Sequence, residues 1–212
     1  MNKLKVKLPF TDIEIDQLPD GQPVTEAANF LQQTVVAHTH RKSVSGLELG
    51  SGNGVISFML ALQKPDWQLT GIELQKELVE LALSNNAKLG LTCSFIEGDL
   101  REYRQLLQHQ GYDLVYANPP WVKAGSGQVS PNPSRAISRQ EVSCTLKDIL
   151  SCIDWCLHAQ GLGWIIYPVE RKAELAREIM QTELEVCNIY QTEESPRSFI
   201  AKLRKKAGTN KW

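Results

Sequence analysis

The chain has 212 residues, of which 42% are hydrophobic and 22% charged, and its formal net charge is −1 at pH 7. These values argue against disordered, collagen-like and disulfide-scaffold proteins, and the near-neutral charge argues against a globally basic surface for nucleic acid. With roughly 100–200 residues per domain as a guide, the length predicts a single domain over residues 1–212.

Short apolar strands alternate with amphipathic helices along the chain, a pattern typical of an α/β fold with a parallel sheet between two layers of helices. The first half is predicted to contain, in chain order, an edge strand over Phe10–Asp16, a helix over Val24–His38, a strand over Ser45–Leu49, a helix over Asn53–Gln63, a strand over Gln68–Ile72, a helix over Gln75–Leu89, and strands over Thr92–Ile96 and Tyr112–Ala117. The second half is predicted to contain a loop over Val122–Pro133, a helix from a capping box at Ser138–Glu141 to Gly161, a strand over Leu162–Tyr167, a helix over Arg171–Thr182, and a hairpin-like pair over Leu184–Gln191 and Ser198–Leu203.

These elements divide the single domain into three parts. An N-terminal strand and helix (1–44) precede a core (45–204), and a short basic tail (205–212) follows it.

The sequence disfavours export, membrane insertion and metal binding. The longest apolar run, Val55–Leu62, is interrupted by Ser57 and is far shorter than the ~18–20 residues that cross a bilayer. Met1–Leu8 alternates lysine with apolar residues and lacks the apolar core of a signal peptide. Five cysteines without a C-x-x-C pair are typical of reduced thiols, and Cys152 and Cys156, four apart on one helix, are expected to pack rather than bind metal. We therefore predict a cytoplasmic protein without a metal site.

A glycine-rich turn, Gly50-Ser-Gly-Asn-Gly54, lies between the strand that ends at Leu49 and the helix that follows. Glycine lets the backbone approach a ligand closely, and a helix N-terminus offers unpaired N–H donors, so this turn is a candidate nucleotide site. A dinucleotide fingerprint would place glycine at position 55, where Val55 stands, which disfavours NAD and favours S-adenosyl-L-methionine. A tight turn with a purely structural purpose would use glycine for the same conformational reason.

Two acidic residues follow the next two predicted strands. Glu73 comes 23 residues after Gly50, where a carboxylate can accept hydrogen bonds from both ribose hydroxyls of a ligand held over the turn. Asp99 follows the third predicted strand and could accept a hydrogen bond from an adenine amino group. For each residue the alternative is an acidic cap or first-turn residue that stabilises a helix N-terminus.

The most informative motif is Asn118-Pro119-Pro120-Trp121, directly after the strand over Tyr112–Ala117. An exocyclic amine or carboxamide nitrogen is a poor nucleophile because its lone pair is delocalised. The Asn118 side-chain oxygen and the Pro119 carbonyl can accept its two hydrogens and aim the lone pair at a methyl sulfonium. Trp121 can stack on the planar group, and the prolines stiffen the turn. A rigid turn with a core tryptophan is the alternative without chemistry.

The order of these features over Ser45–Leu203 resembles class I S-adenosyl-L-methionine-dependent methyltransferases of the small-methyltransferase superfamily. Asn132-Pro-Ser-Arg135 and Arg139-Gln-Glu141, ahead of Thr145–Asp148, make the chain more narrowly similar to the tRNA1(Val) (adenine37-N6)-methyltransferase family. The resemblance implies a Rossmann-like fold with helices on both faces of a mostly parallel seven-stranded sheet, which ends in a C-terminal antiparallel hairpin strand.

The resemblance also implies a set of site residues. The target base would be held by Asn118, Pro119, Pro120 and Trp121. The cofactor would contact Glu48, Gly50, Ser51, Gly52, Gly54, Glu73, Leu74, Asp99, Leu100 and Asn118. RNA phosphates would meet Lys123, Arg135 and Arg139, with a further candidate cluster at Lys202, Arg204, Lys205, Lys206 and Lys211.

The leading hypothesis is a single-domain enzyme that transfers a methyl group from S-adenosyl-L-methionine to the N6 amine of an adenine in RNA, with tRNA as the carrier. The sequence leaves the oligomeric state open, with a monomer favoured. The alternative acceptor is the side-chain amide of a protein glutamine, because other families with Asn-Pro-Pro-aromatic motifs use it. Those families usually carry an N-terminal recognition domain, for which residues 1–44 are too short. A module that binds cofactor or RNA without turnover would not need the amine-polarising oxygen of Asn118, and Val55 disfavours a nicotinamide oxidoreductase.

Overall fold

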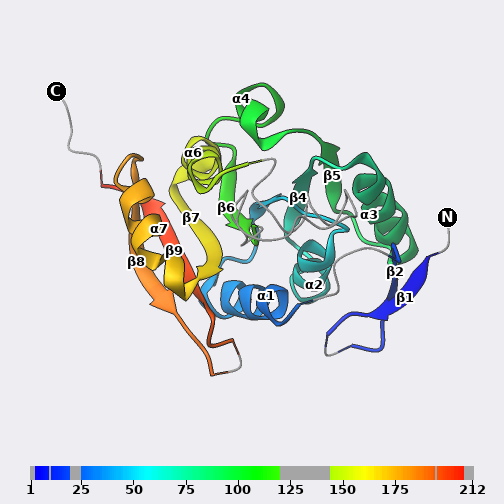
Figure 1. Ribbon diagram of the computed structural model, residues 1–212. Helices are drawn as coiled ribbons and strands as arrows, with labels where there is room; N and C mark the ends of the chain where they lie inside the picture. The colour runs from blue at the N-terminus through cyan, green and yellow to red at the C-terminus, as the bar shows by residue number, and fades with distance from the viewer. Residues whose placement is uncertain (1–2, 10, 20–24, 120–143, 194, 208–212) are drawn as a thin grey trace.

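Seven strands form one sheet at the centre of the computed structural model, which describes residues 3–9, 11–19, 25–119, 144–193 and 195–207 (Figure 1). From one edge to the other, the strands are β5 (Ser94–Glu97), β4 (Gln68–Glu73), β3 (Ser45–Leu49), β6 (Tyr112–Ala117), β7 (Leu157–Pro168), β9 (Ser198–Lys205) and β8 (Leu184–Tyr190). Neighbouring strands are parallel except that β9 runs antiparallel to both β7 and β8. The predicted fold class, a mostly parallel sheet closed by an antiparallel hairpin, is confirmed.

Helices cover both faces of the sheet. One layer contains α1 (Glu26–His38), α2 (Val55–Gln63) and α3 (Lys76–Lys88), and the other contains α4 (Tyr103–Leu106), α6 (Leu146–Cys156) and α7 (Lys172–Ile179), with short 3-10 turns η1 (Leu100–Glu102) and η2 (Val169–Arg171). In Figure 1, α1 and α2 lie below the sheet and α4 and α6 above it. Side chains along each strand alternate between the two layers, so Tyr116 joins the apolar core with α1 and α2, whereas Val115 and Ala117 join the core with α6 and α7.

The N-terminal strand does not extend the main sheet. β1 (Leu4–Lys7) and β2 (Glu14–Gln17) form a separate two-stranded antiparallel sheet, in which Leu4 pairs with Gln17. The edge strand predicted over Phe10–Asp16 overlaps β2, but its bounds are wrong, and β2 pairs with β1 instead of lying at the edge of the main sheet. The physical reason is that the two strands are close in sequence, so β2 pairs with β1 in a hairpin instead of with a strand of the main sheet.

The boundary between α6 and β7 differs most from the sequence prediction. α6 begins later than the helix predicted from Ser138. It starts at a capping box in which the Thr145 hydroxyl accepts from the Asp148 N–H at 3.3 Å and Asp148 accepts from the Thr145 N–H at 2.8 Å. The capping box predicted at Ser138–Glu141 lies outside the described residues. The helix ends at Cys156, and Leu157 already pairs with Tyr112, so backbone pairing with β6 replaces the helical end expected near Gly161.

The last strand also runs further than predicted. β9 continues to Lys205, which pairs with Leu184 of β8, so Lys205 belongs to the sheet rather than to a basic tail. None of the helices in the described ranges is long and apolar enough to span a membrane.

Candidate active site

The C-terminal ends of four parallel strands meet at one edge of the sheet. β4 ends at Glu73, while Asp99, Gly50 and Asn118 follow β5, β3 and β6. The order β5-β4-β3-β6 places these four residues side by side, with neighbouring strands about 4.8 Å apart. From β3 the chain continues to β4 and β5 on one side of β3, and it later returns to the other side of β3 with β6. The C-terminal end of β3 is therefore the topological switch point, the place where open α/β sheets bind ligands.

The glycine turn after β3 needs its glycines for two physical reasons. Gly50, Gly52 and Gly54 have φ of +69°, +56° and +86°, a left-handed backbone that other residues rarely adopt. A Cβ at Gly54 would also lie 2.7 Å from the Phe58 ring and 2.8 Å from the Phe95 ring. A Cβ at Gly50 or Gly52 would meet nothing within 4 Å, so the backbone there is open to a ligand.

Ser51 turns its side chain down toward the sheet. It is 5% exposed, and a Cβ added to Gly71 of β4 would lie 2.6 Å from the Ser51 Cβ and Oγ. The N–H groups of Gly50 and Ser51 both donate to the Ile72 carbonyl, at 2.9 and 3.0 Å, which fixes the turn on β4. The Ser51 side chain packs against Gly71, so the predicted contact of Ser51 with the cofactor stays a prediction.

Glu73 joins the glycine turn to α3. One carboxylate oxygen accepts from the Gly52 N–H at 3.0 Å, and the other accepts from the N–H of Gln75, the N-cap residue of α3, at 2.9 Å. Glu73 is 8% exposed, and burial raises the pKa of its carboxyl. The capping alternative is therefore realised, and the hydrogen bonds of Glu73 to ribose stay a prediction.

Glu48 is buried between β3 and α2. It is 2% exposed, and one carboxylate oxygen accepts from the Ser57 N–H at 3.1 Å and from the Ser57 hydroxyl at 2.5 Å. The same hydroxyl lies 2.8 Å from the Tyr116 hydroxyl of β6. Burial raises the pKa of Glu48 to about 8, and the Glu73 carboxylate adds to this shift. Glu48 thus ties α2 to the two central strands, and its direct contact with the cofactor stays a prediction.

Sequence reasoning did not identify the network formed by Glu48, Ser57 and Tyr116. A signal was present, because Ser57 is the polar residue that interrupts the apolar run Val55–Leu62. A fully buried serine in an apolar helix needs a hydrogen-bond partner, and Glu48 supplies it. Tyr116 gave no such signal, since its place opposite Ser57 depends on the pairing of β3 with β6.

Asp99 caps the 3-10 turn η1. Its carboxylate accepts from the Arg101 N–H at 2.9 Å and pairs with the Arg101 side chain at 2.5 to 3.0 Å. This hydrogen-bonded pair with Arg101 holds the pKa of Asp99 below its usual value. The capping alternative is therefore realised, and hydrogen bonding of Asp99 to an adenine stays a prediction. Leu74 is 38% exposed beside Glu73, and Leu100 is half-buried in η1.

Only the first half of the Asn-Pro-Pro-Trp motif belongs to the described chain. Asn118 is half-buried and Pro119 is buried, directly after β6. Pro120, Trp121, Lys123, Arg135 and Arg139 lie outside the described residues, so their predicted contacts with the base and with RNA stay predictions.

These residues fit S-adenosyl-L-methionine. The open backbone at Gly50 and Gly52 offers room for a ligand, and the Glu73 carboxylate lies beside it and contacts the Gly52 N–H. In the described ranges no cluster of His, Cys, Asp and Glu side chains is arranged to hold a metal ion. Cys152 and Cys156 are both buried, with their sulfur atoms 3.9 Å apart on α6.

Known proteins similar to this chain agree with the geometry of this edge. A tRNA1(Val) (adenine(37)-N6)-methyltransferase from Shewanella sp. (strain MR-4) is 28% identical over 178 residues, which is 82% of this chain and 73% of the relative.

Two solved structures show the same fold. The ribosomal protein L11 methylase from Lactobacillus delbrueckii subsp. bulgaricus superposes with a TM-score of 0.65 at 12% identity and covers 89% of this chain and 83% of its own. The Pyrococcus abyssi tRNA (uracil-54, C5)-methyltransferase, solved in complex with S-adenosyl-L-homocysteine, has a TM-score of 0.62 at 16% identity and covers 95% of this chain and 44% of its own.

The family comparison covers most of the chain. Residues 40–207 match the family described as a methyltransferase domain, and this range holds the glycine turn, Glu73, Asp99 and Asn118. The chain therefore belongs to the methyltransferase domain family, as an enzyme whose cofactor is S-adenosyl-L-methionine.

Proposed function

We propose that the protein methylates the N6 amine of an adenine in RNA, with tRNA as the carrier. One observation carries the proposal. Leu49 pairs with Ala117 in register, so Asn118 follows its strand at the same level as Gly50, the first residue of the glycine turn. An amide that can hold an acceptor amine thus lies one strand away from the backbone that holds the methyl donor.

The chemistry required of the chain is to activate a weak nucleophile. S-adenosyl-L-methionine, when bound, supplies an electrophilic methyl group on a positively charged sulfur. The Asn118 side-chain oxygen and the Pro119 carbonyl would accept the two hydrogens of the amine and localise its lone pair toward that methyl group. The nitrogen gains positive charge as the new C–N bond forms, so it loses its proton only then and needs no strong base beforehand.

The relatives support an RNA substrate. The curated relative from Shewanella is named for the N6 position of adenine 37 in tRNA1(Val), and it matches 82% of this chain. An adenine amine is accessible only when the base leaves its stack, and the predicted stacking of Trp121 would stabilise such a base. The predicted phosphate contacts are Lys123, Arg135 and Arg139.

The C-terminal lysines support RNA binding less than their number in the sequence indicates. Lys205 pairs with Asp154 at 3.1 Å, and Arg204 pairs with Glu185 at 2.6 Å. The ammonium of Lys206 donates to the Thr182 carbonyl at 2.6 Å. These charges are engaged in the fold, so we place the RNA contact around Lys123, Arg135 and Arg139 instead.

The deciding experiment uses the Asn118→Ala variant. We expect the single-turnover rate on tRNA to fall by about 100-fold or more, the usual cost of losing a preorganised polar contact at a reacting centre, while cofactor affinity changes by less than about threefold. Calorimetry with S-adenosyl-L-methionine and a single-turnover assay measure the two effects separately. A fully active Asn118→Ala variant would contradict the assigned role.

The acceptor class is decided by where a labelled methyl group goes. The wild-type protein is incubated with labelled S-adenosyl-L-methionine and a mixture of total RNA and total protein. Release of the label by ribonuclease, with N6-methyladenosine in the digest, supports the proposal. Release by protease alone would instead support methylation of a glutamine side chain.

A further inference from the structure

The end of β7 lies beside Asn118 and Pro119. Ala117, the last residue of β6, pairs with Ile165, so Asn118 and Pro119 leave β6 where β7 continues toward Tyr167, two residues after Ile165. Tyr167 and Pro119 are both buried, and Tyr167 shares the α6 and α7 core with Ala117 and Ile165. Tyr167 thus lies on the strand next to the one that leads into Asn118 and Pro119.

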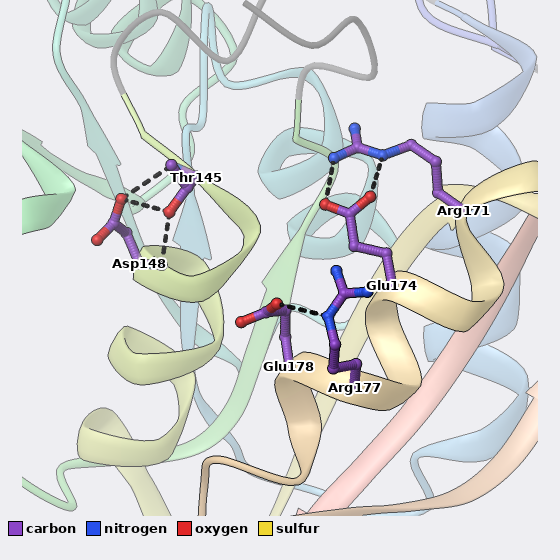
Figure 2. A network of polar contacts seen from close by, with 6 residues as sticks. All are labelled: Thr145, Asp148, Arg171, Glu174, Arg177 and Glu178. Atoms are coloured by element: carbon purple, nitrogen blue, oxygen red, sulfur yellow. Dashed lines mark hydrogen bonds and ion pairs between the residues drawn. The ribbon is translucent and has the colours of Figure 1, made fainter.

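Arg171, in the turn η2 after β7, packs on that ring. Its guanidinium carbon lies 4.7 Å from the centre of the Tyr167 ring. Glu174 holds the guanidinium by two hydrogen bonds, from Nε at 3.0 Å and from Nη2 at 2.9 Å, which Figure 2 shows side by side. A bidentate pair of this kind fixes both the position and the plane of the arginine.

Packing alone does not explain an arginine at this place. The side chain of Arg171 is 9% exposed, and removing a charge from water costs several kcal/mol per ion, so an apolar residue would fill the space at lower cost. Arg177 of α7, also drawn in Figure 2, is an exposed arginine for comparison. It meets Glu178 through a single contact at 3.3 Å, and its side chain is 68% exposed. The buried pair between Arg171 and Glu174 adds defined geometry next to the acceptor segment.

We propose that Arg171 is a positioning residue for methyl transfer. Clamped by Glu174, it holds Tyr167, and through Tyr167 it holds Pro119 and Asn118 where their oxygens polarise the acceptor amine. This inference rests on the proposed role of Asn118 and Pro119. A misplacement of about 1 Å at a reacting centre can cost about 100-fold in rate, so a residue that never touches the substrate can still control the transfer step.

The test compares two arginines on neighbouring turns. Arg171→Met should lower the single-turnover rate at saturating RNA and cofactor by at least about tenfold, while cofactor affinity stays within about twofold. Arg171→Lys should recover only part of the rate, because an ammonium cannot make the bidentate contact. Arg177→Met removes an exposed arginine of the same helix and should leave rate and affinity unchanged.

Thermal unfolding of each variant separates positioning from a loss of folded protein. Glu174→Gln keeps Arg171 in place but weakens its clamp, so it should lower the rate without unfolding the protein at the assay temperature. The inference would be overturned if Arg171→Met and Glu174→Gln both kept the wild-type rate. It would also be overturned if Arg177→Met lowered the rate as much as Arg171→Met does. Rate losses that disappear after correction for the folded fraction would overturn it as well.

Failure of the inference can be told from failure of the proposed function. If the wild-type protein labels protein instead of RNA, the proposed substrate is wrong, and the same variants are compared on the protein acceptor. If the wild-type protein labels RNA and Asn118→Ala is inactive but the Arg171 and Glu174 variants are fully active, only the positioning role is wrong.

Discussion

Two glutamates at the ends of neighbouring strands have separate roles because they meet different partners. Burial raises the pKa of both Glu48 and Glu73. Glu48 gives its described contacts to Ser57 of α2, whereas Glu73 contacts Gly52 of the glycine turn. Glu73 therefore lies against the predicted cofactor turn, and Glu48 is placed to stabilise the helix that follows the turn.

Replacing Glu73 by alanine should weaken cofactor binding. We expect a loss of about 1.5–3 kcal/mol in binding free energy, since hydrogen bonds to a charged acceptor are lost and Gly52 loses its partner. The control is Glu77→Ala, which removes an exposed acidic residue from the first turn of α3. Calorimetric titration of S-adenosyl-L-methionine into both variants measures the difference, and equal affinities would return Glu73 to a purely structural role.

Glu48 makes the stability of the protein depend on pH in a defined direction. Its pKa is about 8 in the folded protein, against a usual value of 4.5. Between these values the unfolded chain releases the proton while the folded protein keeps it, so the free energy of unfolding falls with rising pH by about 1.4 kcal/mol per unit from this group.

The Glu48→Gln variant should remove this dependence. Glutamine resembles the protonated acid and can accept the same two hydrogen bonds from Ser57, so the variant should be similar to wild type near pH 5 and more stable near pH 8. Urea unfolding from pH 5 to 8 for both proteins gives the difference in free energy. Parallel curves would show that Glu48 is ionised in the folded protein at neutral pH.

At the scale of elements, one buried asparagine attaches the N-terminal hairpin to the core. Asn85 of α3 is 0% exposed, and its side chain donates to the Asp16 carbonyl and accepts from the Asp16 N–H, both at 2.9 Å. The Asp16 carboxylate pairs with Lys5 at 2.6 Å and also with Lys88. Hydrogen bonds from these two lysines lower the pKa of Asp16 to about 2. The side chain of Asn85 thus acts as a substitute for a neighbouring strand.

Replacing Asn85 by alanine should loosen the hairpin. Each buried backbone group left without a partner costs about 1–3 kcal/mol, and the loss falls mainly on β2. We expect the Asp16 amide to exchange its hydrogen much faster, whereas amides of β3 and β6 keep their protection. Asn188→Ala, an exposed position on β8, serves as the control. Uniformly faster exchange in every strand would show that the hairpin and the core unfold together.

At the scale of the whole molecule, the last strand, β9, lies between β7 and β8, and its end contacts α6. The Lys205 ammonium pairs with Asp154 of α6 at 3.1 Å, and the Lys206 N–H donates to the Glu183 carbonyl at 2.7 Å. Lys205, at the end of β9, and Lys206, directly after it, therefore contribute to the fold as well as to the surface charge.

Two truncations measure this contribution. A chain that ends at Arg204 lacks Lys205 and Lys206, whereas a chain that ends at Ala207 keeps both. We expect the shorter chain to be less stable by about 1–3 kcal/mol, which lowers the thermal midpoint by roughly 2–10 °C relative to the longer one. Equal midpoints would show that these contacts add nothing to stability.

Much of the fold and part of the site could be predicted from the sequence. The bounds of β3 and β6 match the predicted strands at Ser45–Leu49 and Tyr112–Ala117, because their apolar residues and their flanking turns are local signals. The glycine turn, Glu73, Asp99 and Asn118 were found by their position after predicted strands. Parallel strands bring such positions to one edge of a sheet, so chain order alone was sufficient to gather them.

Other features depend on contacts between residues distant in sequence, and only the tertiary structure decided them. The hydrogen bond between Ser57 and Tyr116 needs β3 and β6 to be neighbours. Tyr167, on which Arg171 packs, lies near the end of β6 only because β7 is the next strand in the sheet. The sequence predicts that Lys205 belongs to a basic tail, whereas in the structure it pairs with Leu184 of β8. Periodicity and turn residues report local preference, whereas strand order and register follow from burying apolar surface on both faces of the sheet at once.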